Sequence, residues 1–250
     1  MKTALMVEFQ KIRRRRIWVI VGLMVLVEIL WSLWGTGRMD ARDRAQGWMF
    51  LLYQFPLLNA IIMPTIAAVV ASRLSDMEHK GQTLKMLNTV MPAGRLFAAK
   101  FLCGAMYMLT AVSLQLIVMV AFGLSSGFSG PPPVDRLLNY LLFTTSVNLT
   151  LLLLQQVLSL LVKNQMVALA VGLVGSFAGL FIMFFPQNFA RLVLWGYYGV
   201  LMQVGMNWDR ATRVTDFYYT PVDWAGVLTL TAAFAAIYFA GRALFLKKEV

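Results

Sequence analysis

The chain has 250 residues, of which 60% are hydrophobic and only 13% are charged, and its formal net charge is +11. Soluble domains average about half apolar and about a quarter charged residues, so the composition excludes an ordinary soluble protein. Apolar runs of about 20 residues recur, each long enough to cross the hydrocarbon core as a helix, and the alternating segments of about 10 residues typical of membrane β-barrels are absent. We expect an all-α integral membrane protein.

The first predicted element is an amphipathic helix over residues 1–16 that lies on the membrane surface. Leu5 and Phe9 belong to its apolar face, whereas Glu8 and the arginines at 13–16 belong to its polar face. Such a helix buries its apolar side among lipid headgroups while arginines meet anionic lipid. A simple charge cluster that orients the next span is the alternative. Either interpretation predicts that the N-terminus lies in the cytoplasm.

Six apolar runs are predicted to span the membrane. The first is too long for a signal-peptide core and has no small-residue cleavage site at its end, so we expect it to be retained. Between the fifth and sixth spans, residues 186–220 are rich in aromatic residues, which indicates one or two short outer-leaflet helices. The predicted spans are residues 17–34, 48–71, 96–124, 137–161, 166–185 and 224–245.

The distribution of basic residues supports this topology, because Lys and Arg gather on the cytoplasmic side of membrane proteins. With six spans and a cytoplasmic N-terminus, the C-terminus is also cytoplasmic, and most of the 22 Lys and Arg residues fall on that side. Only seven fall in the predicted outer segments, namely Arg38, Arg42, Arg44, Arg136, Arg191, Arg210 and Arg213.

Polar residues inside the predicted spans are candidates for lining a substrate path. Interhelical hydrogen bonding is the favoured alternative, because polar side chains commonly bond across helices in membranes. Glu28, the acid among them, is also a candidate for proton coupling. The favoured interpretation is a neutral or hydrogen-bonded glutamate that faces the bundle. The candidates are Glu28, Gln54, Asn59, Asn148 and Gln155.

The connection between the second and third spans, residues 72–95, is a long polar interval. From Gln82 to Met91 its pattern is helical, with Leu84 and Leu87 on one face, and Pro92 ends the pattern. A helix of about ten residues is marginal alone in water, so it needs something to pack against. A soluble partner, the bilayer surface and the chain's own bundle all remain open at this point.

Motifs for chemistry within the chain are missing. No G-x-x-x-x-G-K-[ST] sequence is present, so we do not expect ATP to bind to this chain by a P-loop. The single histidine and single cysteine, without H-E-x-x-H or paired carboxylates, give no zinc site and no nucleophile–base arrangement. We therefore predict no catalytic, cofactor-binding or metal-binding residue, and no enzyme activity in this chain.

The order of these features resembles the permease subunit of a type-two ABC exporter: a basic interfacial helix, six spans, a coupling segment after the second span and short outer helices before the sixth. Within that segment, Glu78-His79-x-Gly81 followed by Lys85-x-Leu87-x-Thr89-x-x-Pro92-x-x-Arg95 and Ala99-Lys100 resembles lantibiotic self-immunity and bacitracin-export permeases. The opening Glu8-x-x-Lys11-x-x-Arg14 is similar to theirs.

The resemblance implies a function in exporting an amphipathic peptide or antibiotic across a bacterial cytoplasmic membrane, as in immunity or resistance. The partners it implies are cytosolic ABC ATPase subunits, which hold ATP and Mg²⁺, and a second permease copy or a sister permease; no nucleic acid is expected. A membrane scaffold or sensor that binds a cytosolic partner through residues 72–95 is the alternative. The residues implied to contact the ATPase, on a coupling helix over Met77–Met91, are Met77, Glu78, Thr83, Leu84, Lys85, Leu87 and Met91.

Overall fold

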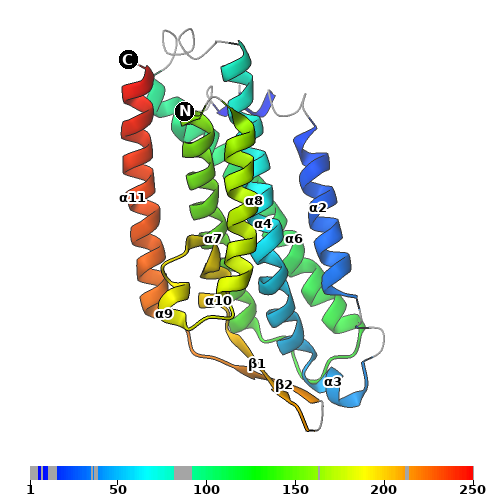
Figure 1. Ribbon diagram of the computed structural model, residues 1–250. Coiled ribbons are helices and arrows are strands. Elements are labelled where there is room, and N and C mark those ends of the chain that lie inside the picture. Colours follow the sequence, from blue (N-terminus) through cyan, green and yellow to red (C-terminus); the bar gives the residue numbers. More distant parts are fainter. Residues whose placement is uncertain are drawn as a thin grey trace.

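The computed structural model is a bundle of long helices that run alternately up and down, with a small β-hairpin at one end (Figure 1). We call this end the hairpin end. The model describes the chain in these ranges: 5–6, 8–10, 16–34, 36, 39–81, 92–162, 164–211 and 214–249, with side chains left undescribed at 77–81 and 248–249.

The long helices coincide with the apolar runs of the sequence. Helix α4 lies at the centre of the bundle and packs against α2, α6, α7 and α8, while α11 packs on α7 and α6 (Figure 1). The elements in chain order are α2 (Ile17–Ser32), α3 (Ala41–Ala45), α4 (Gly47–Gly81), α6 (Ala93–Ser125), α7 (Val134–Leu161), α8 (Gln165–Ile182), α9 (Gln187–Ala190), η2 (Leu194–Gly196), α10 (Tyr197–Val200), β1 (Val204–Asp209), β2 (Val214–Tyr219) and α11 (Trp224–Glu249).

Five helices are long and apolar enough to cross a membrane, which confirms a mostly helical membrane fold. Helix α2 is equally apolar but has 16 residues, a length of about 24 Å against a hydrocarbon core of about 30 Å. The count of six spans therefore stays a prediction. The candidate spans are Gly47–Asp76, Ala93–Ser125, Val134–Leu161, Gln165–Ile182 and Trp224–Lys247.

Helix α4 does not end where its apolar run ends. The sequence prediction placed the end of the second span at residue 71, but the helix continues to Gly81. Ser72, Leu74 and Ser75 are buried, so this added part still packs against its neighbours. Hydropathy detects the loss of apolar residues, whereas a helix persists until a breaking residue or a loss of packing stops it.

The segment before α11 contains more than the short helices expected there. Short helices α9 and α10 lie in this segment, and their place in the outer leaflet stays a prediction. Strands β1 and β2 form an antiparallel hairpin that was not predicted, with Val204 opposite Tyr219 and Asp209 opposite Val214. Tyr218 covers Gly205, where a Cβ atom would lie 2.4 Å from the tyrosine ring. The aromatic ring thus fills the gap that a glycine leaves in a strand.

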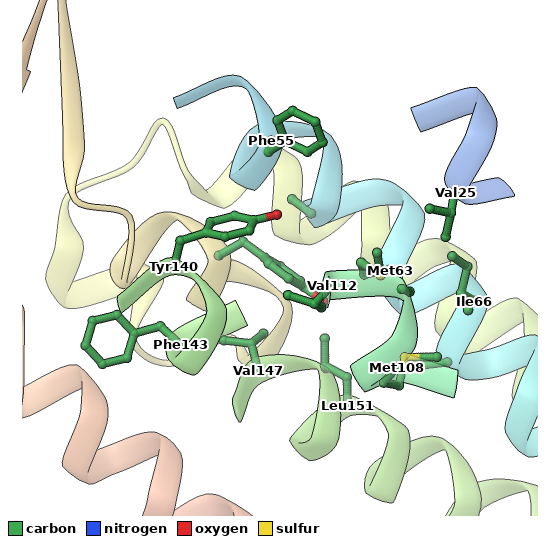
Figure 2. Packing of buried hydrophobic residues seen from close by; sticks show 14 of the residues in the cluster. Val25, Phe55, Met63, Ile66, Met108, Val112, Tyr140, Phe143, Val147 and Leu151 are labelled. Carbon is green, nitrogen blue, oxygen red and sulfur yellow. The ribbon is translucent and has the colours of Figure 1, made fainter. Parts of the chain in front are cut away.

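The core is formed where α2, α4, α6 and α7 meet. Figure 2 shows buried hydrophobic side chains from these helices, among them the Tyr140 ring of α7. Helix α8 approaches α4 closely at Gly172, because a Cβ atom there would lie 2.4 Å from the Cβ of Ala68. The labelled core residues are Val25, Phe55, Met63, Ile66, Met108, Val112, Tyr140, Phe143, Val147 and Leu151.

Candidate functional site

Three polar side chains form a closed ring of hydrogen bonds inside the bundle. The amide of Asn59 on α4 donates to the hydroxyl of Tyr140 on α7 at 2.9 Å. Tyr140 donates to the carbonyl oxygen of Gln115 on α6 at 2.8 Å, and the Gln115 amide donates to Asn59 at 3.0 Å. All three side chains are buried. We call this set the polar ring, and it joins three helices through directional bonds.

Glu28 of α2 borders the polar ring. It is fully buried, and it interacts with the Gln115 side chain. Neither carboxylate oxygen makes a hydrogen bond within the described part of the chain. Glu28 therefore brings a carboxyl group from a fourth helix to the border of the ring without joining its hydrogen bonds.

The other candidate path residues are distributed along the bundle. Asn148 of α7 accepts a hydrogen bond from the hydroxyl of Tyr198 on α10. Gln155, with its amide oriented to satisfy both atoms, donates to the carbonyl of Ala168 at 3.0 Å and accepts from the amide of Gly172 at 3.2 Å. Gln54 is half-buried on α4 and makes no hydrogen bond with the residues that the structure describes.

Asn59 and Asn148 thus make hydrogen bonds between helices, as does Gln155 with its amide reoriented, and these are the contacts that the favoured alternative describes. A path lined by these residues stays a prediction. Gln115 and Tyr140 were missed as site residues, although a glutamine inside an apolar run is itself a signal. Tyr140 carried no such signal, because tyrosine is common in membrane helices.

A buried ion pair lies at the end of the bundle away from the hairpin. The Lys100 ammonium group on α6 is 3.2 Å from the Glu8 carboxylate and donates to the carbonyl of Leu74 on α4 at 2.7 Å. The two charged side chains are 0% and 1% exposed. The sequence prediction of Glu8 on the solvated face of a surface helix is therefore wrong, because Lys100, 92 positions away, supplies a buried partner.

The residues predicted to contact an ATPase follow Leu74 closely in the sequence. Met77 and Glu78 belong to the last turns of α4 rather than to a separate helix, and their side chains fall outside the description. Thr83, Leu84, Lys85, Leu87 and Met91 lie outside the described residues.

The hairpin is fastened to the start of α4. Gln46 accepts from the backbone amide of Phe217 at 2.7 Å and donates to the Asp216 carboxylate at 3.0 Å, which Arg42 also contacts at 2.7 Å. These hydrogen bonds, first from Gln46 and then from Arg42, lower the pKa of Asp216 below its ordinary value. Phe217 packs against Phe50 of α4.

The short helices at the hairpin end are held to α11. The Arg191 guanidinium donates to one carboxylate oxygen of Asp223 at 2.7 and 2.9 Å. The other oxygen of Asp223 accepts from the backbone amide of Gly226 at 3.0 Å in the first turn of α11. Asp223 thus acts as a helix cap and as an ion-pair partner.

A small pocket lies between α4, α7 and α10 at the hairpin end. It is lined by aromatic rings, with an arginine among the few polar groups, and it shares Tyr140 with the polar ring. The lining residues named here are Leu52, Pro56, Arg136, Tyr140, Phe143 and Tyr198. The Arg136 guanidinium in this lining donates to the side-chain oxygen of Gln203 at 3.2 Å and to the carbonyl of Thr220 at 3.0 Å.

Comparison with known proteins agrees with a transport role. A family model described as ABC-2 family transporter protein matches residues 4–179, which is more than half of the chain. No curated protein is similar enough in sequence to be matched. The matched range includes α2, α4, α6, α7, most of α8 and both members of the buried ion pair. The chain therefore belongs to the ABC-2 family of transporter proteins and is a multi-pass membrane permease whose partner is an ABC ATPase.

Proposed function

We propose that this permease is the membrane subunit of an ATP-driven exporter in a bacterial cytoplasmic membrane, with six membrane helices and both termini in the cytoplasm. The orientation is supported by the basic residues, of which only seven of 22 fall on the hairpin side under this topology. A membrane role for α2 is supported by its exposed apolar face, which includes Trp18, Leu23, Leu26 and Trp31. A short span is accommodated by local thinning of the bilayer at modest cost.

The observation that carries the proposal is the course of α4. Its candidate span ends at Asp76, the helix runs on to Gly81, and the next helix begins at Ala93. The residues in between join two long spans at the end that we assign to the cytoplasm. A rigid helix that extends beyond the bilayer is a lever on which a docked ATPase would act.

We further propose that Met77–Met91 is the docking segment, with Leu84 and Leu87 filling an apolar groove of the ATPase and Glu78 and Lys85 fixing the register by charge. ATP-driven closure of two ATPase subunits would move this segment and rearrange the spans. The permease would act as a pair, either with an identical copy or with a sister subunit. Family membership favours this account over the scaffold or sensor.

The experiment is co-purification of the permease with its partner ABC ATPase. Leu84→Asp combined with Leu87→Asp is expected to abolish association, because two charges would enter an apolar contact. Leu192→Asp, which changes a leucine that is 80% exposed near the hairpin end, serves as the matched control and retains the ATPase. Full association of the Leu84→Asp/Leu87→Asp variant would refute the docking site.

For the substrate we propose an amphipathic peptide or antibiotic, on the resemblance of Glu78-His79-x-Gly81 and the motif after it to lantibiotic self-immunity and bacitracin-export permeases. Glu28, Gln54, Asn59, Asn148 and Gln155 remain the proposed path. Survival of cells that carry the permease and its ATPase, exposed to such peptides, is the test. Unchanged sensitivity across a panel of lantibiotics and bacitracin would remove the substrate assignment and leave the ATPase partnership intact.

A further inference from the structure

The buried ion pair between Glu8 and Lys100 lies at a junction of three parts of the chain. Glu8 belongs to the N-terminal segment, Lys100 to the start of α6, and the carbonyl of Leu74 to the part of α4 just before its candidate span ends. We call these three groups the junction. In the sequence, the junction flanks the proposed docking segment, because Leu74 precedes that segment and Lys100 follows it.

Local stability is a poor explanation for Lys100. Removing both charges from water is costly, so well-packed apolar residues of similar volume often serve a core equally well. An ion pair with full burial at this position therefore invites an explanation beyond holding the fold together.

The geometry of the junction suits it to transmit movement between α4 and α6. The ammonium group holds a carboxylate at 3.2 Å and a carbonyl at 2.7 Å, so displacement of α4 relative to α6 must break or re-form a directional contact. Apolar side chains in the same place would let the helices slide past each other. Buried polar contacts that are either made or broken give a packed interface two discrete arrangements.

We propose that the junction of Glu8, Lys100 and the Leu74 carbonyl transmits movement of the docking segment to α6 and to the N-terminal segment. This inference rests on the proposed function, because it presumes that an ATPase acts on that segment. Lys100 is then a positioning residue: it touches neither nucleotide nor substrate, and it fixes where α4, α6 and the N-terminal segment lie with respect to one another.

The test separates a structural role from a coupling role through a pair of substitutions. In the full complex with its ATPase, in lipid nanodiscs, Lys100→Met alone removes the ammonium group that lies 3.2 Å from the buried Glu8 carboxylate and is expected to lower the unfolding midpoint by about 10 °C. Glu8→Met combined with Lys100→Met removes both charges and is expected to restore the midpoint almost fully. Lys247→Met, at an exposed lysine of the same end, is the matched control and changes neither stability nor coupling.

Coupling is read as the change in ATP hydrolysis rate that the permease causes in the bound ATPase. The Glu8→Met/Lys100→Met variant is expected to retain the bound ATPase. The change that it causes in the ATP hydrolysis rate is expected to be about tenfold smaller than that caused by the unmodified permease. If the double variant regains both stability and the full response, the pair is structural only and the proposal is overturned. If the unmodified permease binds no ATPase at all, the proposed function itself has failed, which is a different result.

A second measurement decides the case if the double variant does not fold. Hydrogen exchange of the unmodified complex is compared with and without trapped ATP. The proposal predicts that altered protection in residues 72–81 is accompanied by altered protection in residues 8–10 and 96–103. A change in 72–81 that leaves the other two ranges unaltered overturns transmission through the junction.

Discussion

Replacing Tyr140 with phenylalanine removes one hydroxyl from the polar ring and leaves the aromatic ring of the side chain in place. Two bonds disappear: the one donated to Gln115 at 2.8 Å and the one accepted from Asn59 at 2.9 Å. Interhelical hydrogen bonds in membranes contribute about 0.6 kcal/mol on average. A buried partner left unsatisfied costs about 1–3 kcal/mol. The substitution is therefore expected to lower the free energy of unfolding by about 1–3 kcal/mol.

The assay is thermal unfolding of the purified permease in detergent. At about 2–4 °C per kcal/mol for a chain of this size, the midpoint should fall by roughly 2–12 °C. Tyr53→Phe is the matched control, because the Tyr53 hydroxyl on α4 makes no hydrogen bond with any described residue, and its midpoint should change by less than about 1 °C. Equal midpoints for the two variants would refute the polar ring as a stabilising contact between helices.

Two further predictions concern the close packing of α8 and the attachment of the hairpin. Gly172→Val places atoms where Ala68 already lies and should destabilise the bundle by about 1–3 kcal/mol in the same unfolding assay, whereas Gly22→Ala, with nothing within 4 Å, should not. Asp216 has a lowered pKa, so its ionised form stabilises the docked hairpin; this contribution is complete above the ordinary value of 3.8 and is lost as the pH falls through the lowered one. Hydrogen-exchange protection factors of residues 204–209 and 214–219 should fall in that acid range, and Asp216→Asn should remove this dependence on pH. The same pH profile in Asp216→Asn as in the unmodified protein would contradict the prediction.

The long helices were predictable because the membrane leaves the backbone few choices. An apolar run of about 20 residues in hydrocarbon must satisfy its own hydrogen bonds, and a helix does so. Two glycines of α8 allow close packing, since Gly172 lies against Ala68 of α4 and Gly175 lies against the Trp195 ring. Hydropathy did not give the end of α4, because a helix supported by packing continues through polar residues to Gly81.

Contacts between distant positions could not be predicted from one sequence. The pairing of Glu8 with Lys100 joins residues 92 positions apart, and each residue alone looks like an ordinary surface charge. The hairpin was missed for a related reason. Its strands are held by cross-strand contacts and by Gln46, whereas the spacing of aromatic residues before them suggested only helices.

The account depends most on the claim that an ATPase docks between α4 and α6. A photo-crosslinking amino acid at position 84 tests this directly, with the same label at Trp208 on the exposed hairpin as the reference. In membranes that contain the ATPase, the account predicts crosslinks to the ATPase from position 84 and none from position 208. Crosslinks from position 208, or none from position 84 when the ATPase is bound, would contradict it.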